Sequence, residues 1–367
     1  MAHEELSPLN ITPGAIRFNT DTMKLEYFRI GMESGSTSSY AGIGTLAAGE
    51  WVQITTDTPD IQTGGTRGLI SGGTTSSTDT NQIQYVNLDT TGNAIDFGNL
   101  LADRLGGGSL ASRTRGIYAG GVQNPGDGND TDQIQFVTIS SLGDATDFGN
   151  LIGVLGYIQG GGSGNSTRGL FAGGATTPAY TNTDLIQYIT IASTGDSVDF
   201  GNLTASARVT NCGSNSTRSI IAGGVNHDTI DYVTISTQGN AADFGDLFNT
   251  SLWSTGMCSN SIRGVFGPNR SNSDGTLDGT MSYITIATLG NAVEFGESTQ
   301  TRDACGAMAS STRGAWAGGR GPAPSETYQD VIDYVQIMSL GDAIDFGDLL
   351  AARRWGTGCS NGHGGLG

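Results

Sequence analysis

The chain has 367 residues, of which 59 are glycine and only 14% are charged. Its 35 acidic and 17 basic residues give a formal net charge of −18, which disfavours binding to nucleic acid or to anionic membranes. Glycine does not recur at every third position, which excludes collagen, and the clustered apolar residues disfavour disorder. No apolar run reaches the roughly 18 residues of a membrane helix, and no basic segment with an apolar core opens the chain. We therefore expect a soluble protein of short strands without membrane insertion or a secretory leader.

Residues 1–60 contain three candidate strands and precede a repeated region. The segment GAIRFNTDTMKLEYFRI at 14–30 predicts two strands joined by an Asn-Thr-Asp turn, and GEWVQI at 49–54 predicts a third. A three-stranded sheet of this size is marginally stable alone. The segment is therefore interpreted as a β attachment module that needs a partner surface.

Residues 61–367 contain six copies of a repeat whose arginines lie 45 to 53 residues apart. Each arginine opens a segment such as RGLFAGG at 168–174, with an apolar pair and, in most copies, a double glycine. An alternating segment such as IQYITI at 186–191 follows and predicts a half-buried strand. A turn such as TGDSVDFG at 194–201 then predicts a tight hairpin. A block rich in small residues, such as RLGGGSLAS from Arg104, suits a strand near a crowded axis.

Four short strands in about 50 residues match the length of a kelch-type propeller blade. The small-residue block is missing before the first copy, but a spare one, RWGTGCSNG, starts at Arg354. We therefore predict an all-β fold in which residues 353–361 pair within 65–100 and close a six-bladed β-propeller. Seven blades are the alternative, should residues 43–58 form another blade. The repeat resembles kelch propellers, but it has the Phe of DFG where kelch repeats have Trp, and its fifth copy, GVFGPNR, lacks the double glycine.

The repeated arginines are predicted to form structural ion pairs with the acids of the turns, because a partly buried guanidinium needs acceptors for its five donors. The arginines are Arg67, Arg115, Arg168, Arg218, Arg263 and Arg313, and the acids are Asp96, Asp147, Asp199, Asp243, Glu294 and Asp345. Calcium binding by these acids is a less favoured alternative, since single acids do not supply the roughly 6 to 8 oxygens that calcium takes. No metal or other cofactor is expected.

A catalytic site would have to break the repeat, and no copy clearly carries an unmatched catalytic set, so no enzyme activity is expected. The three histidines lack metal-ligand spacing and are expected at the surface: His3, His227 and His363. The cysteines occupy equivalent blocks of separate copies and are predicted to be free, buried thiols: Cys212, Cys258, Cys305 and Cys359.

The copies differ most in the loop between the double-glycine strand and the following strand. Variable loops on a rigid scaffold are where binding is usually found. Tyr180, Arg270 and Tyr328 lie in three of these loops and are the candidate binding residues.

Two stretches of the chain resemble virion structural proteins of tailed bacteriophages. One is the run from Gly14 to Thr22 with Lys24-Leu-Glu and Trp51-Val-Gln-Ile; the other is the repeat of STRGxxAGG, IxYxTI and GDAxDFG. The resemblance implies a non-enzymatic tail-fibre-like or capsid-decorating protein, present in several copies or as a homo-oligomer on the virion surface after assembly in the bacterial cytoplasm. The N-terminal module would bind a tail, baseplate or capsid protein, and the propeller would face outward, where it could bind a host receptor or glycan.

Two other functions stay open at this point. A virion-associated glycan-degrading enzyme would need unmatched acids, for which Asp103, Asp303 and Glu326 are the available candidates. A cellular kelch-like adaptor is the third interpretation.

Overall fold

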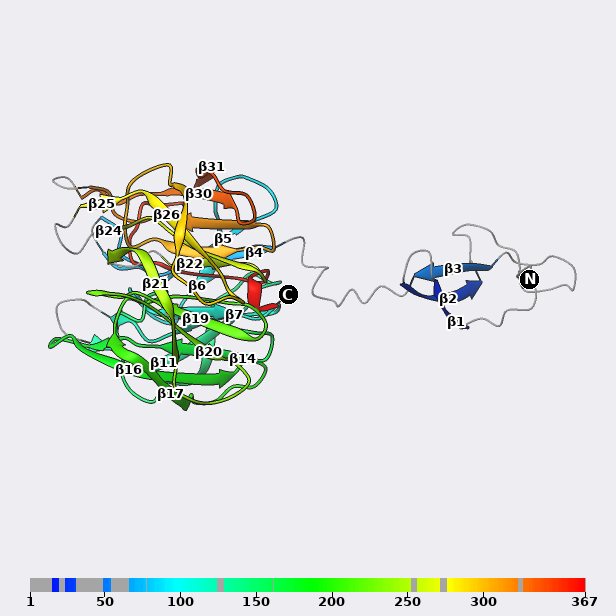
Figure 1. Cartoon of the computed structure of the whole chain (residues 1–367), viewed down its shortest axis with the longest axis horizontal. Coiled ribbons are helices and arrows are strands. Elements are labelled where there is room, and N and C mark those ends of the chain that lie inside the picture. The colour runs from blue at the N-terminus through cyan, green and yellow to red at the C-terminus, as the bar shows by residue number, and fades with distance from the viewer. Residues whose placement is uncertain are drawn as a thin grey trace, which may run out of the picture. The chain divides into compact units, whose positions relative to one another are not determined.

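The computed structural model describes residues 15–19, 24–30, 49–53, 66–76, 78–123, 129–160, 162–251, 256–270, 276–322 and 326–366 (Figure 1). The chain divides into two compact units, Met1–Gln62 and Thr63–Gly367. None of the described segments is a helix long and apolar enough to cross a membrane.

The first unit contains one antiparallel sheet in the order β1-β2-β3. Its strands are β1 (Ile16–Asn19), β2 (Lys24–Ile30) and β3 (Gly49–Gln53), so the three strands predicted for this region are confirmed. Phe28 is buried, and Arg17 Nε donates to Glu26 Oε2 at 2.8 Å across the first strand pair.

The described part of the second unit is a six-bladed β-propeller of antiparallel sheets, so the predicted fold is confirmed. Blade 1 consists of β32 (Thr357–Ser360), β4 (Arg67–Ser71), β5 (Gln82–Asn87) and β6 (Ile95–Asn99). Blade 2 consists of β7 (Gly108–Ala111), β8 (Arg115–Ala119), β11 (Gln133–Thr138) and β12 (Thr146–Asn150). Blade 3 consists of β13 (Gly162–Gly164), β14 (Arg168–Ala172), β16 (Thr181–Thr190) and β17 (Val198–Ala207), with the short β15 (Ala175–Thr176) added to β16.

Blade 4 consists of β18 (Asn211–Ser214), β19 (Arg218–Ala222), β20 (His227–Thr234) and β21 (Ala242–Ser251). Blade 5 consists of β22 (Met257–Ser259), β23 (Arg263–Phe266), β26 (Thr280–Thr285) and β27 (Val293–Glu297). Blade 6 consists of β28 (Gly306–Ala309), β29 (Arg313–Ala317), β30 (Val331–Gln336) and β31 (Ile344–Asp348). Two small hairpins extend loops, β9 (Val122–Gln123) with β10 (Asn129–Asp130) and β24 (Asn269–Arg270) with β25 (Leu277–Asp278).

The ring is closed by the end of the chain, as the spare copy of the inner-strand block predicted. Strand β32 pairs antiparallel with β4, with Cys359 opposite Leu69 and Thr357 opposite Ser71. Strand β3, which lies in the region considered for a seventh blade, pairs with β2 in the first unit instead. Blade 1 therefore combines strands from the two ends of the propeller unit.

The two apolar residues after each arginine face opposite neighbours. Leu69 packs with Tyr118 and Val137 of blade 2, whereas Ile70 packs with Met308 and Ala315 of blade 6. Successive side chains of a strand point to opposite faces. One apolar pair per blade therefore serves two blade-to-blade interfaces, and the core lies between the blades.

Neighbouring blades are also joined by main-chain hydrogen bonds from the turn before each DFG segment. Between blades 1 and 2, Gly143 N donates to Phe97 O at 2.9 Å, and Asn99 N donates to Asp144 Oδ1 at 2.9 Å. Equivalent bonds recur at the other five junctions, with Asn or Asp as the side-chain acceptor. A Cβ on Gly98, where φ is +150°, would lie 2.3 Å from Gly143 O. The glycine of DFG therefore permits the close approach of two blades.

The six repeated arginines have other partners than the predicted acids. Arg168, for example, donates from Nη1 to Ile235 O of the next blade at 2.8 Å, and its guanidinium lies 4.4 Å from the centre of the Tyr188 ring. The other five make the same pair of contacts with a carbonyl of the neighbouring blade and an aromatic ring of their own blade.

The turn acids lie apart from these arginines. All six are exposed at the start of the outer strands, and no ion pair within the described ranges joins one of them to a repeated arginine: Asp96, Asp147, Asp199, Asp243, Glu294 and Asp345. The predicted pairing is therefore replaced by carbonyl and cation–π contacts, because the arginine points across the blade interface while the acid faces solvent at the rim.

The inner strands leave little space at the axis of the ring. Two cavities of about 50 and 20 Å³ are lined by small residues, including Ser109, Gly162 and Gly358. Spaces of this size hold water, whereas ligand pockets are usually about 300 Å³ or more. These cavities are therefore too small for a substrate-sized ligand.

The C-terminal segment lies against the ends of several inner strands, near Gly164, Ser214 and Asn260. The 3-10 helix η3 (Gly364–Leu366) is buried, and Arg113 Nη2 donates to Leu366 O at 2.7 Å. His363 lines the larger cavity, and its Nε2 lies 2.8 Å from Ala111 O. His363 is thus half-buried and not fully exposed at the surface as expected, because the tail folds back over the ends of the inner strands.

Candidate functional site

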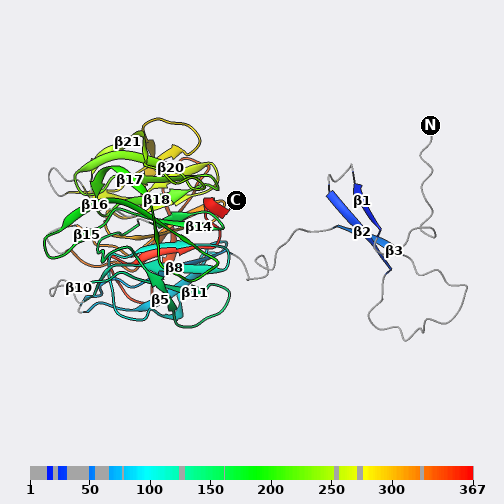
Figure 2. The ribbon, with the colours of Figure 1, turned by 90° about the horizontal axis from the view of Figure 1, so that it is seen from below.

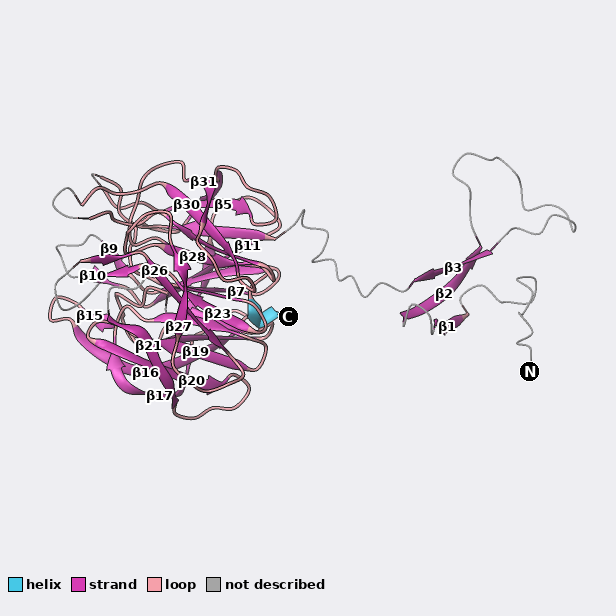
Figure 3. Cartoon of the chain, turned by 45° about the horizontal axis from the view of Figure 1, so that its top comes forward, coloured by secondary structure: helices cyan, strands magenta, loops and turns pink. Residues whose placement is uncertain are grey.

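The propeller has two different faces. Each double-glycine strand starts at an arginine on one side of the disc and ends at its glycines on the other. We call the side with the arginines, the DFG turns and η3 the turn face, and the opposite side the loop face. Figure 1 and Figure 2 show β24, β25, β10 and β15 on the side away from the C-terminus, and Figure 3 shows the same arrangement from another direction.

Backbone strain is concentrated on the loop face. In the described ranges, seven non-glycine residues have positive φ, with values from 40° to 71°: Tyr157, Tyr180, Val209, Asn226, Ala304, Glu326 and Trp355. Four of them precede inner strands and three lie in the loops after double-glycine strands, so all seven lie on this face. Such conformations cost about 1–3 kcal/mol each and cluster at functional sites. The four before inner strands share one position of the repeat, where Gly106 also has positive φ, so there the conformation is repeated and only the side chain differs. The differing side chains and loops mark the loop face as the candidate functional site.

Hydrogen bonds and packing around the axis hold several of these strained residues in place. Trp355 N donates to Ala304 O at 2.9 Å, Gly106 N donates to Trp355 O at 3.1 Å, and Val209 N donates to Tyr157 O at 2.8 Å. These bonds join the starts of inner strands from different blades. The side chains of Tyr157, Val209, Ala304 and Trp355 also form one apolar cluster with Leu105, Val122 and Val225 at the loop-face ends of the inner strands.

A row of aromatic and arginine side chains crosses this face from blade 3 to blade 6. We call it the loop-face stripe; in order, its members are Arg208, Tyr180, Tyr157, Trp355, Arg354 and Tyr328. The ring centres of Tyr180 and Tyr157 are 5.5 Å apart, as are those of Tyr157 and Trp355. Tyr180 is 48% exposed and Trp355 only 6%, so the stripe has an exposed end and a buried floor.

The stripe arginines lie over its terminal tyrosines. The Arg208 guanidinium is 5.2 Å from the centre of the Tyr180 ring, and its Nη1 donates to Asn182 Oδ1 at 2.9 Å. The Arg354 guanidinium is 4.9 Å from the centre of the Tyr328 ring. Burial and then a hydrogen bond with Tyr180 raise the pKa of Tyr157, so this phenol is neutral at physiological pH.

Carboxylates lie close to the stripe. Burial raises the pKa of Asp79; the nearby charge of Asp103 raises this pKa further, and that of Arg354 lowers it. Asp130 accepts a hydrogen bond from Thr177 Oγ1 at 2.9 Å, and its charge acts on Tyr157. The two stripe arginines therefore do not form an uncompensated positive patch.

An ionic cluster joins the loops of blades 5 and 6 beside the stripe. Arg320 binds Asp303 with two hydrogen bonds, of 3.0 Å from Nε and 2.6 Å from Nη2. Arg270 Nη1 lies 3.7 Å from Asp303 Oδ2, and its Nη2 lies 3.7 Å from Glu326 Oε1. Asp303 is completely buried, so the cluster fixes the position of the loops.

The three predicted binding residues all lie on the loop face, but in different settings. Tyr180 and Tyr328 belong to the stripe, whereas Arg270 belongs to the ionic cluster. Of the acids considered for an enzyme, Asp103 is exposed, Asp303 is buried against Arg320, and Glu326 is half-exposed beside Arg320.

Four residues of the stripe were missed by the sequence analysis. Tyr157, Arg208, Arg354 and Trp355 open inner-strand blocks and so looked like repeat residues. The available signal was asymmetry: an aromatic residue stands at this point in two copies, where others have Gly106, Val209 or Ala304.

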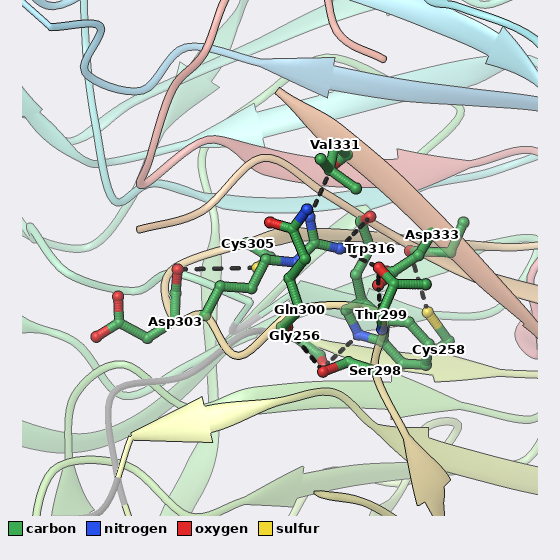
Figure 4. A network of polar contacts seen from close by, with 12 residues as sticks. Gly256, Cys258, Ser298, Thr299, Gln300, Asp303, Cys305, Trp316, Val331 and Asp333 are labelled. Carbon is green, nitrogen blue, oxygen red and sulfur yellow. Dashed lines mark hydrogen bonds and ion pairs between the residues drawn. The ribbon is translucent and has the colours of Figure 1, made fainter. Parts of the chain in front are cut away.

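A second set of arginines holds the inner strands to their blades from inside. Arg302 donates to Val331 O at 2.7 Å, to Trp316 O at 3.1 Å and to the carboxylate of Asp333. Figure 4 shows Val331, Trp316 and Asp333 around this contact, with the Asp303 carboxylate pointing away from Asp333. Arg104 and Arg353 have carbonyl and glutamine acceptors instead, and burial lowers the pKa of each to about 10.

The remaining candidate ligands are dispersed or buried. Within the described ranges, no three His, Cys, Asp or Glu side chains form a group that could hold a metal ion. His3 lies outside these ranges, and His227 starts β20 on the loop face. All four cysteines are free and buried, and burial raises the pKa of Cys212, Cys305 and Cys359 to about 12 and that of Cys258 still further.

No known family model matches this sequence, and a search of curated proteins found no match either. The fold and the geometry of the loop face therefore carry the functional argument.

Proposed function

We propose that this chain is a non-enzymatic surface protein of a tailed-phage virion that recognises the host with its loop face. In this proposal the N-terminal unit binds a tail, baseplate or capsid protein, and several copies are present on the particle. The sequence resemblance described above suggests the virion setting. The row of aromatic and arginine side chains on the loop face, which is not repeated from blade to blade, is the observation that supports recognition at this face.

The path of the chain is compatible with outward display. Thr66, the first described residue of the propeller, lies beside Gly362 on the turn face, because a Cβ on Gly362 would be 2.4 Å from Thr66. The chain therefore enters the propeller on the face opposite the stripe.

Immunogold labelling of purified virions tests the location, and binding of the labelled full chain to host cells tests recognition. We expect antibody on the particle surface and saturable cell binding. Particles that carry none of this protein would overturn the virion assignment. Cell binding that is absent from both the chain and the assembled particle would overturn recognition and leave only a decorating role.

Attachment can be tested separately with a change in the first unit. Phe28 is buried in the small sheet, so Phe28→Asp should disrupt that sheet. We expect the variant to be lost from particles while its propeller melts as in the wild type and still binds cells. Normal incorporation of Phe28→Asp would contradict attachment through the N-terminal unit.

A further inference from the structure

The loop-face stripe has the composition of a binding surface for an extended, ring-containing polymer. It combines four aromatic rings with two guanidinium groups, and Arg208 and Arg354 lie over the rings of Tyr180 and Tyr328. Aromatic side chains offer flat apolar faces at low entropic cost, and neighbouring polar groups add directional hydrogen bonds. Sugar rings present such an apolar face together with hydroxyl groups, and single-stranded nucleic acids present stacked bases.

The electrostatics distinguish these two polymers. Nucleic-acid tracks need a positively charged groove along the phosphates, whereas this chain carries a net charge of −18. Close to the stripe, Asp79 faces Arg354, and Asp130 acts on Tyr157. A polyanion would meet these carboxylates, so a neutral polymer is favoured.

The stripe is held rigid before any ligand binds. Tyr157, Tyr180 and Trp355 all have positive φ, and the hydrogen bonds from Trp355 N to Ala304 O and from Val209 N to Tyr157 O fix its floor. Arg208 Nη1 also donates to Tyr180 O at 3.3 Å, which holds the loop that carries the exposed ring. A preorganised surface loses less conformational entropy on binding.

We propose that the loop-face stripe is a binding track for a neutral polysaccharide, with Tyr180 as the exposed stacking residue and Tyr157 and Trp355 as the floor. This inference rests on the proposed function, since it names the ligand class of the recognition face. The guanidinium groups of Arg208 and Arg354 have donors left for sugar hydroxyl groups, because Arg208 makes two side-chain hydrogen bonds and Arg354 makes none among the contacts of the described residues.

The test uses the full chain and polysaccharide extracted from the cells to which it binds, separated by anion exchange into neutral and anionic fractions. Dextran, galactomannan and amylose serve as additional neutral probes, and oligo-dT serves as the nucleic-acid probe. We expect binding to the neutral fraction and to no more than a trace of the anionic fraction or oligo-dT.

Variants locate the binding on the stripe. Tyr180→Ala should weaken affinity by roughly tenfold, the loss expected for one aromatic stacking contact, while Tyr180→Phe should stay within about threefold of the wild type because the ring is kept. Phe248→Ala is the matched control, because Phe248 is 46% exposed, close to the 48% of Tyr180, and lies outside the stripe. The melting temperature of each variant shows whether it is folded.

Each contrary outcome has a separate meaning. Cell binding without binding to any neutral polysaccharide would overturn this inference and leave the proposed function standing. Stronger binding of oligo-dT or of the anionic fraction would also overturn it. Equal losses of polysaccharide affinity in Tyr180→Ala and Phe248→Ala would show that the stripe is not the binding site. Shortened polysaccharide chains after incubation would replace binding with enzymatic cleavage.

Discussion

The turn face and the loop face of this propeller are built from the same six repeats but follow opposite rules. On the turn face, the arginine–carbonyl contact and the hydrogen bonds of the DFG junction recur at every blade. On the loop face, neither the stripe nor the ionic cluster has a sixfold counterpart among the residues that the structure describes. Residues repeated six times build the ring, and residues that break the repeat are the ones to test for function.

The most severe way to break this framework is to remove the closing strand. A chain that stops after Gly356 lacks β32, so β4 loses its inner partner in blade 1. We expect loss of most of the free energy of unfolding, which is about 5–15 kcal/mol for such proteins. Urea denaturation followed by circular dichroism measures it.

A chain that stops after Gly362 is the control for this truncation. It keeps β32 and loses only the segment that contains His363 and η3. It should unfold cooperatively and lose less of the free energy of unfolding than the chain that stops after Gly356. If the chain that stops after Gly356 were as stable as the wild type, closure by β32 would not be needed to hold the ring together.

The next largest effect is expected at the buried ion pair of blade 6. Asp333→Asn leaves the Arg302 guanidinium without its carboxylate, although it is completely buried. Breaking such a pair costs about 3–5 kcal/mol. The free energy of unfolding from urea titrations of the variant and the wild type gives this difference, and a loss below about 1 kcal/mol would contradict the role of the pair.

Blade 4 offers the matched comparison, because Asp231 occupies the equivalent strand position and no ion pair among the described residues joins it to an arginine. It accepts hydrogen bonds from Thr204 N and Thr204 Oγ1, and burial raises its pKa. Because the pKa is raised on folding, the protonated form of Asp231 stabilises the folded state. This contribution to the free energy of unfolding is lost as the pH rises through the raised pKa. Asp231→Asn should therefore gain stability relative to the wild type between about pH 4 and pH 7. A constant difference across this range would contradict the effect.

Two glycines of the same turn motif separate close approach from backbone strain. Gly98 has φ +150° and lies against Gly143 O, whereas Gly92 has φ +154° and a Cβ added to it would meet no other atom within 4 Å. Gly98→Ala should cost about 3 kcal/mol or more, from strain and overpacking together. Gly92→Ala should cost only the strain, about 1–3 kcal/mol. Equal losses of unfolding free energy would show that the blades can separate to admit the methyl group.

The smallest effects distinguish the observed arginine contacts from the predicted ion pairs. Arg168→Met removes the hydrogen bond to Ile235 O and the contact with Tyr188, at a cost of about 1–2 kcal/mol. Asp199→Asn should change stability by no more than about 0.5 kcal/mol, because Asp199 is exposed at the rim. A strong coupling energy between the two substitutions in a double-mutant cycle would instead support the predicted ion pair between Arg168 and Asp199.

The strands and the closure of the ring were predictable because they depend on periodicity and on counting copies. The spare block from Arg354 was enough to place the last strand in blade 1. The partner of Arg168 was not predictable, because a carbonyl is present at every residue and leaves no mark in the sequence. The position of His363 depends on the path of the tail over Ala111 of blade 2.

The contacts within the stripe were also not predictable from the sequence. Tyr157 and Trp355 lie almost two hundred positions apart and in blades that are not sequential neighbours, yet their ring centres are 5.5 Å apart. Only the closed ring brings them together at the axis. Tyr180 and Tyr328 were predictable from the sequence as candidate binding residues, because the loops that carry them vary between copies.

The pairing of β32 with β4 also sets the order in which the protein can fold. Arg67 and Asn361, which are bonded in the finished blade, are 294 positions apart in the chain. During synthesis, blade 1 must wait with an unpaired inner edge until the other five blades have been translated. Such an edge can pair with another chain. Interrupted translation products are therefore expected to aggregate, and the finished ring can form only after residue 360 has left the ribosome.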